Sequence, residues 1–130
     1  MTKVTCMVVT PEATALEEVA EFVALPLYDG EVGIGGNHSA MIGRLGFGEL
    51  RLRTGSDVKR YYIDGGFVQV ADNVVSVLTE RAVPVADLRR SDAERQLAEA
   101  LKMPAATAEQ QEARNRRMVQ ARAQMRIARG

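Results

Sequence analysis

The sequence predicts a mainly β domain followed by a pair of α-helices, and three observations support this fold class. Eight of the eleven glycines lie between Pro26 and Gly55, where they separate short apolar runs. Glycine readily adopts the positive φ of tight turns, so this pattern favours strands that fold back on one another. Turn signals recur about every eight to twelve residues, which is typical of a sandwich or barrel. After Pro84 the composition changes to strong helix formers, and no glycine occurs between Gly66 and Gly130.

The alternation of apolar and polar residues predicts the individual strands. We expect strands at 3–9, 19–27, 31–34, 45–47, 50–53, 59–64, 67–71 and 74–79. Asp29-Gly30 is a hairpin signal, and Gly65-Gly66 predicts a bend or bulge between two of the strands. In the first strand Cys6 shares a face with two valines, which predicts that this lone cysteine is a small buried hydrophobe.

The last part of the chain predicts two helices joined by a short proline loop, and hence an antiparallel hairpin. The first helix covers 88–102 with Asp87 as its N-cap, and the second covers 108–128 after a capping box of Thr107 and Gln110. Their apolar stripes are thin and rich in alanine: Ala93, Leu97, Ala100 and Leu101 on the first helix, and Met118, Ala121 and Met125 on the second. Such stripes bury little apolar surface, so we expect the hairpin to be held less firmly than the β domain.

Charge divides the chain in the same place as composition. Residues 1–86 carry 7 basic and 11 acidic side chains, a net charge of −4, whereas residues 87–130 carry 10 basic and 6 acidic side chains, a net charge of +4. This difference suggests two parts with different partners. No run of apolar residues reaches the roughly 18 needed to span a bilayer, and the N-terminus lacks the pattern of a signal peptide.

Several classes of protein are disfavoured by what the sequence lacks. His38 and Cys6 are the only histidine and the only cysteine, so a Cys/His metal site cannot be assembled. No paired-carboxylate, Ser/His or Cys/His constellation stands at a recognisable spacing. The glycines form neither a GxGxxG nor a P-loop motif. The chain has no tryptophan and only three tyrosines, which argues against a stacking platform for nucleic acid. An independent enzyme is therefore the least favoured interpretation.

The second helix ends in an unusual concentration of arginine. From Arg114 onward the chain has six arginines and no acidic residue. Three of them fall on one helical face, which we call the arginine face: Arg122, Arg126 and Arg129. Three interpretations stay open: a solvated helical face, docking on the carboxylates of an acidic partner, and contact with nucleic-acid phosphates.

Four motifs follow one another in the β part: DGEVGI at 29–34, GNHSAMI at 36–42, GELRL at 48–52 and YIDGGFVQVADNVVSVL at 62–78. With them the chain resembles the epsilon chain of F-type ATP synthases. In that family a GE-(L/V)-GI segment leads to P-G-H-A-P-L-L, then to a G-x-(I/L)-R-(I/V) strand and a Y-(L/V)-S-G-G-(F/I)-L-E-V run. Asp64 stands where the family usually has serine, and Gly36 where proline is frequent. The resemblance covers Val4 to about Leu88.

The resemblance implies a mainly β fold with C-terminal α structure: an N-terminal ten-stranded β-sandwich at 1–86 and an antiparallel two-helix hairpin at 87–130. It implies a non-catalytic, cofactor-free subunit of the rotating central stalk, bound to the gamma chain and the c-ring. Such a subunit couples ion-driven rotation to ATP synthesis by the alpha and beta chains, at the cytoplasmic face of the bacterial inner membrane. The resemblance further implies that the hairpin is mobile and inhibits ATP hydrolysis when it extends along gamma.

The resemblance also assigns roles to individual residues. Glu31 lies in the segment that faces the polar loops of the c-ring, and His38 and Met41 lie in the segment against gamma. The arginine face would meet an acidic loop of the beta chain. From the residues alone, Glu31 is equally an ordinary solvated carboxylate, and His38 a half-buried loop histidine.

Some family members bind ATP through a motif at the start of the first helix. The motif consists of Leu or Ile, then Asp, two variable residues, Arg and Ala. Residues 86–91, ADLRRS, match this motif at Asp87 and Arg90 but depart from it at both ends. A capping role for Asp87 and a solvated Arg90 are the alternative. A stand-alone regulatory or nucleic-acid-binding module with a basic helical arm also stays open at this point.

Overall fold

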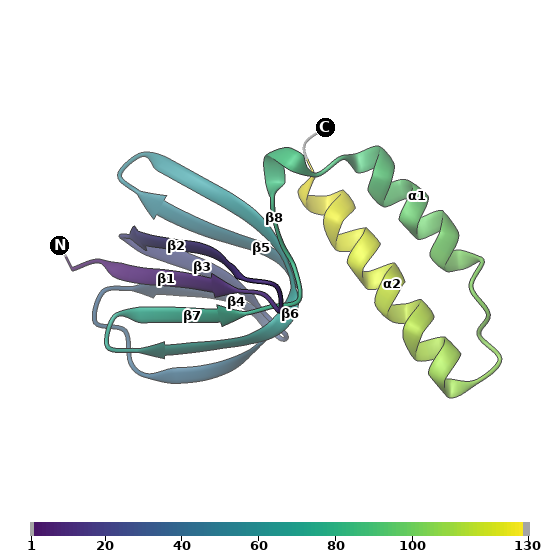
Figure 1. Ribbon diagram of the computed structural model, residues 1–130, viewed down its shortest axis with the longest axis horizontal. Coiled ribbons are helices and arrows are strands. Elements are labelled where there is room, and N and C mark those ends of the chain that lie inside the picture. Colours follow the sequence, from purple (N-terminus) through teal and green to yellow (C-terminus); the bar gives the residue numbers. More distant parts are fainter. Residues whose placement is uncertain (1, 129–130) are drawn as a thin grey trace. The chain divides into compact units, whose positions relative to one another are not determined.

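The chain folds into two units. Eight strands form the first unit, and this unit ends at Pro84. The computed structural model describes residues 2–128 (Figure 1). Within them the strands are β1 (Val4–Val9), β2 (Thr14–Ala20), β3 (Phe22–Leu27), β4 (Gly30–Gly35), β5 (Met41–Thr54), β6 (Asp57–Ala71), β7 (Val74–Leu78) and β8 (Ala82–Pro84).

The strands belong to one sheet that curls around an apolar interior. Their order is β2-β1-β7-β6-β5-β3-β4, with β8 paired to β6 outside this path. Neighbours are antiparallel except β1 and β7, which run parallel. The sheet curls far enough that β1 contacts β3, and β2 contacts β5, although these strands are not hydrogen-bonded to one another (Figure 1). Side chains such as Val8, Leu25 and Ile63 are fully buried in this interior.

The strand count of ten was wrong, because two long strands, β5 and β6, run where shorter strands were expected. β5 has 14 residues and β6 has 15, where the sequence predicted two short strands in each case. Their pairing is interrupted only where Gly46 of β5 lies opposite Gly65 of β6. Gly65 and Gly66 have φ of 70° and 109°, so the predicted bend at this point is confirmed. Counting each long strand as two segments would turn eight into ten.

The structure also tests the strand and the hairpin that were predicted before β5. The predicted strand 19–27 is wrong, since β2 ends at Ala20 and β3 begins at Phe22. The β2 sequence contains two adjacent glutamates, which are poor strand formers, and this hid the strand. The hairpin predicted from Asp29-Gly30 is confirmed, because Leu27 pairs with Gly30 across the turn between β3 and β4.

Two helices dominate the second unit, which begins at Val85. A short 3-10 helix (Val85–Asp87) precedes α1 (Arg90–Leu101) and α2 (Ala108–Ile127), and the two α-helices pack against each other. The predicted capping box is confirmed: Thr107 accepts a hydrogen bond from the Gln110 backbone N–H, and the Gln110 side chain accepts from the Thr107 N–H. None of the helices within residues 2–128 is long and apolar enough to cross a membrane.

The predicted N-cap of α1 was wrong. Asp87 is the last residue of the 3-10 helix, and Arg89 takes the N-cap position without a side-chain hydrogen bond. The Leu88 N–H donates to the Val85 carbonyl oxygen and closes the 3-10 turn, so Asp87 belongs to this turn and α1 begins only at Arg90, two residues later than expected. The predicted stripe of α1 is buried at Ala93 and Ala100, but Leu101 is exposed.

Cys6 is predicted to be chemically inert in the folded protein. It is fully buried in the core, and burial, together with the nearby Glu18 carboxylate, raises the pKa of its thiol to about 12. We expect no reaction with a thiol reagent at pH 8 until denaturant is added. Because the folded pKa lies above the unfolded one, this group stabilises the fold below about pH 9, and the contribution is lost as the pH rises from there. Rapid labelling without denaturant would contradict this packing.

Candidate partner-binding surfaces

Three large apolar side chains share one outer face of the β unit. Ile42, Phe67 and Leu78 are 78%, 59% and 53% exposed. Phe67 of β6 lies directly opposite Leu78 of β7 on one side and Arg44 of β5 on the other. Ile42 is two residues from Arg44 and so faces the same way. We call Ile42, Phe67 and Leu78 the apolar strip; contiguous exposed apolar residues of this kind mark interaction sites.

An aromatic–cation pair adjoins the apolar strip. The Arg44 guanidinium lies over the Tyr28 ring at 4.8 Å from its centroid, and the Tyr28 N–H donates to the Arg44 carbonyl oxygen at 2.8 Å. Tyr28 is 71% exposed in the turn between β3 and β4. Tyrosine and arginine are enriched where protein interfaces carry most of their binding energy.

The loop that carries His38 is tied to the turn between β6 and β7. Asn37 and Asn73 both have positive φ, and the Asn37 N–H donates to Asn73 Oδ1 at 2.6 Å. His38 is half-buried, and its Nδ1 donates to the Ser39 carbonyl oxygen at 2.7 Å. Met41 follows as the first residue of β5, where it is half-buried against the core. The loop is therefore held close to the β5 end of the apolar strip.

Glu31 belongs to an ionic cluster rather than standing alone in solvent. Arg51 donates to it with both ends of its guanidinium, Nη2 to Oε1 at 2.6 Å and Nη1 to Oε2 at 3.0 Å. Arg51 Nη1 is also 3.5 Å from Glu49 Oε1, which accepts from Arg60 Nη1 at 2.9 Å. The hydrogen bond to Glu31 is the main reason that the pKa of Arg51 is raised. We call Glu31, Arg51, Glu49 and Arg60 the ionic cluster.

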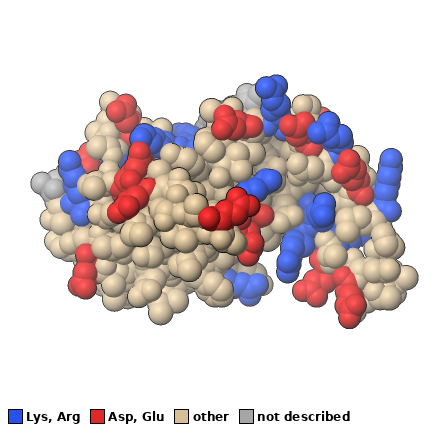
Figure 2. Space-filling model, in the orientation of Figure 1, with Lys and Arg blue, Asp and Glu red and all other residues tan. Residues whose placement is uncertain are grey.

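The arginine face is exposed in the part that the structure describes. Arg122 and Arg126 lie one turn apart on α2, and both are exposed. Within residues 2–128 neither of them joins an ion pair. Arg129 lies outside the described residues. On the face shown in Figure 2, lysine and arginine side chains stand among acidic ones over the surface.

Asp87 and Arg90 differ in the contacts that their side chains make. Arg90 is the first residue of α1; its Nε donates to Glu94 Oε1 at 3.2 Å, and its Nη1 lies 3.5 Å from the carbonyl oxygen of Met125 near the end of α2. Among the described residues, Asp87 makes no side-chain hydrogen bond or ion pair. Arg90 thus already bridges the two helices of the hairpin.

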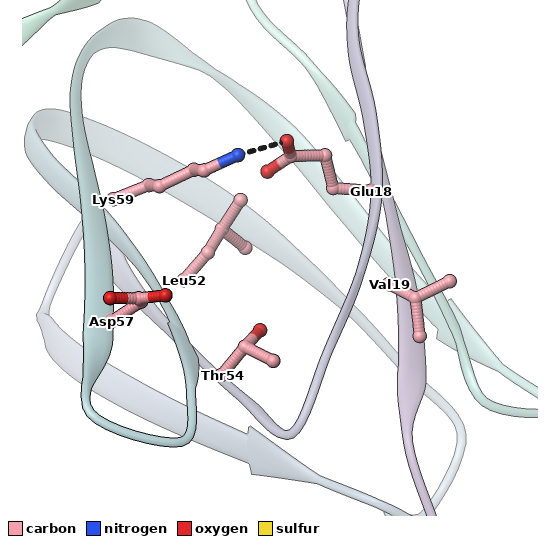
Figure 3. Close-up of a pocket in the computed structure, with 6 residues that line it drawn as sticks. All are labelled: Glu18, Val19, Leu52, Thr54, Asp57 and Lys59. Atoms are coloured by element: carbon pink, nitrogen blue, oxygen red, sulfur yellow. Dashed lines mark hydrogen bonds and ion pairs between the residues drawn. The ribbon is translucent and has the colours of Figure 1, made fainter.

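A groove of about 330 Å³ lies between β2 and the β5–β6 hairpin (Figure 3). Its lining consists of Glu18, Val19, Leu52, Thr54, Asp57 and Lys59. The Lys59 ammonium is paired with the Glu18 carboxylate across the groove, so among the lining residues there is no unpaired cation for an anionic ligand. Residues 2–128 hold no cluster of three or more His, Cys, Asp or Glu suited to a metal ion.

Residues 3–85 match the model of a known protein family. The family model described as ATP synthase, delta/epsilon chain, β-sandwich domain matches residues 3–85. The chain belongs to this family. The ATP synthase epsilon chain of Rhodopirellula baltica is 52% identical to it over 124 residues, which are 95% of this chain and 97% of that one. The epsilon chain of Desulfitobacterium hafniense is 41% identical over 97 residues, 73% of this chain and 74% of the other.

Chains in two solved ATP synthase structures have the same fold. A chain of the Euglena gracilis mitochondrial ATP synthase, in a structure of OSCP, F1 and c-ring, matches with a TM-score of 0.83 at 21% identity, over 95% of this chain and 79% of that one. A chain of the Tetrahymena thermophila central stalk and c-ring matches with a TM-score of 0.77 at 18% identity, over 98% of both. These two likenesses show the fold, and the family model and the 52% identical relative confirm the resemblance seen in the four sequence motifs.

The motifs did not reveal every surface residue of interest. The apolar strip was missed because its members come from three strands that only the sheet register brings together. A break in the alternation at Phe67-Val68 was the one sequence signal for an apolar side chain on the outer face. Both residues are apolar, but only Val68 lies in the core. Arg51 was read as part of a strand motif, with no indication of its partner.

Proposed function

We propose that this chain is the epsilon subunit of an F-type ATP synthase, a non-catalytic part of the central stalk that couples rotation of the c-ring to ATP synthesis. The observation that carries the proposal is the 52% identity to a bacterial epsilon chain along nearly the full length of both. Its partners are the gamma chain, the c-ring, and the catalytic alpha and beta chains. It works at the cytoplasmic face of the bacterial inner membrane, which it reaches through the complex. A stand-alone nucleic-acid-binding module is not favoured.

The gamma chain docks on the apolar strip and on the neighbouring loop with His38 and Met41. The loop ends at the start of β5, where Met41 is half-buried against the core and the next residue, Ile42, faces outward in the apolar strip, so the loop lies beside the end of the strip. Exposed apolar side chains lose contact with water when a partner covers them, and this favours association. The Asn37–Asn73 hydrogen bond holds the loop in place before gamma binds, which reduces the ordering that binding requires.

The c-ring is met by the segment that contains Glu31. This residue lies near the start of β4, just after the β3–β4 turn. Its side chain is 51% exposed, so its carboxylate oxygens are accessible to a donor on a ring loop.

The helical hairpin inhibits ATP hydrolysis by extending towards the catalytic head. Its two helices bury mainly alanine against one another, so little apolar burial opposes their separation. The arginine face then binds carboxylates of the beta chain, where arginine makes paired hydrogen bonds. ATP would bind the folded hairpin through Asp87 and Arg90. To reach Arg90 it would have to displace the Glu94 carboxylate.

Alanine at Arg122, Arg126 and Arg129 is expected to relieve the inhibition while gamma binding stays unchanged. Each bidentate contact to a carboxylate contributes roughly 1.5–3 kcal/mol, so losing three weakens the inhibited state by about 1,000-fold or more. The measurement is ATP hydrolysis by a catalytic head reconstituted with each variant, alongside gamma binding.

The matched control replaces Arg114, Arg116 and Arg117, which lie earlier on α2, and removes the same charge. Inhibition should survive in this control. Full inhibition by the Arg122/Arg126/Arg129 variant would reject the role of the arginine face, and equal relief by both variants would show that only total charge matters.

A further inference from the structure

The contact between Glu31 and Arg51 joins two of the four sequence motifs. Glu31 belongs to the DGEVGI segment, and Arg51 is the arginine of the GELRL strand, 20 residues further along the chain. Both carboxylate oxygens are engaged by separate guanidinium nitrogens, at 2.6 and 3.0 Å. This two-point geometry fixes the orientation of the carboxylate as well as its position.

The pair reaches across an intervening strand. Glu31 lies on β4 and Arg51 on β5, and these strands are separated in the sheet by β3. At the crossing β3 contributes Ala24, which lies opposite Arg51 and is buried. The small side chain leaves room for the arginine to extend over it towards β4. Because β4 is last in the strand order, the pair also ties this edge strand to the middle of the sheet.

The ionic cluster is electrically balanced. It contains two carboxylates and two guanidiniums in the order Glu31, Arg51, Glu49, Arg60, with each neighbouring pair in contact. A partner that approaches Glu31 therefore meets an ion pair and not an isolated negative charge. An ionised carboxylate has about four lone-pair sites, so Glu31 can still accept hydrogen bonds after Arg51 has used two of them.

We propose that Arg51 is a positioning residue for docking on the c-ring: it holds the Glu31 carboxylate as a fixed, neutralised hydrogen-bond acceptor for the polar ring loops. This inference rests on the proposed function, in which Glu31 faces the ring. A fixed acceptor spares the ordering of a mobile side chain on binding. A neutralised one binds with little dependence on salt, because screening weakens the attraction of net charges more than short hydrogen bonds.

The experiment measures binding of the reconstituted gamma–epsilon stalk to the purified c-ring at low and at high salt. We expect Glu31→Gln and Arg51→Gln each to weaken binding by roughly tenfold. Arg51→Lys keeps the positive charge but loses the two-point contact. We expect it to bind less tightly than the wild type with little salt dependence, whereas Arg51→Gln leaves the Glu31 charge unbalanced and should bind in a strongly salt-dependent way. A merely structural role of Arg51 would not produce this difference between the two variants.

Arg53→Gln is the matched control. Arg53 lies two residues further on the same face of β5 and stacks on Phe22, 5.6 Å from its ring centroid, and this variant should bind the ring like the wild type. Gamma binding and the urea midpoint of each variant establish that it is folded. Ring binding by Arg51→Lys that equals the wild type at both salt concentrations would overturn the proposal.

Two further outcomes distinguish a failure of this inference from a failure of the proposed function. If Glu31→Gln binds the ring normally, Glu31 is not a docking acceptor, and the positioning role of Arg51 falls with it. If the wild-type stalk binds neither gamma nor the ring, the proposed function itself fails. A loss with Glu31→Gln and both Arg51 variants, together with normal binding by Arg53→Gln, supports the inference.

Discussion

Gly66→Ala is expected to destabilise the β unit by about 4 kcal/mol or more, a loss at the upper end of single substitutions. A methyl group at Gly66 would lie 1.8 Å from the carbonyl oxygen of Leu78, a backbone atom that cannot move without disturbing the pairing of β6 with β7. The φ of 109° at this residue is also unfavourable for any residue with a side chain. Domains have about 5–15 kcal/mol of stability in total, so the variant should unfold at much lower urea concentration.

Two other glycines separate the steric effect from the backbone effect. Gly55 has a φ of 61° but open space around it, so Gly55→Ala should lose only about 1 kcal/mol. Gly35 has open space and no positive φ, so Gly35→Ala should be close to neutral. A urea midpoint for Gly66→Ala that matches Gly55→Ala would show that the β6–β7 junction is not as tightly packed as the structure describes.

Phe67→Glu is expected to abolish association with gamma while leaving the fold intact. Phe67 is 59% exposed, so its replacement removes little packing from the core. In the complex the glutamate would be a charge buried without a partner, at the centre of the apolar strip. Truncation of a hot-spot residue at the centre of an interface costs about 2 kcal/mol or more, and a buried charge adds to it. Affinity for gamma should therefore fall by about 100-fold or more.

Val58→Glu provides the control for this substitution. Val58 is on the same strand, is 42% exposed, and lies outside the apolar strip. This variant should bind gamma like the wild type in a titration by calorimetry. Equal loss of affinity in both variants would indicate a general effect of the added charge, and unchanged binding by Phe67→Glu would place gamma on another surface.

Local sequence signals predicted those parts of the fold that depend on neighbouring residues. The Thr107–Gln110 capping box and the β3–β4 hairpin are both settled within a few residues, and both are confirmed. The continuity of β5 and β6 was not predicted, because glycines that usually end a strand here only bend it. Asp87 is a strong N-cap residue type, but the 3-10 turn at 85–87 moved the start of α1 beyond it.

The contacts at the candidate surfaces depend on residues that are distant in the sequence, so local signals did not predict them. Glu31 and His38 were chosen because motifs point to them, and the motifs say nothing of their contacts. The partnership of Glu31 with Arg51 depends on the register of three strands and on the small Ala24 between them. The apolar strip depends in the same way on pairing between β5, β6 and β7. Neither arrangement can be read from spacing along one strand.

The central claim is that this chain is a stalk subunit whose hairpin inhibits the catalytic head. The most direct test is ATP hydrolysis by a head stripped of this subunit, after adding either the whole chain or a version that ends at Ala86. We predict that both versions bind and that only the whole chain lowers the rate of hydrolysis. Binding by both without inhibition by either would contradict the inhibitory role of the hairpin, and binding by neither would contradict the stalk function itself.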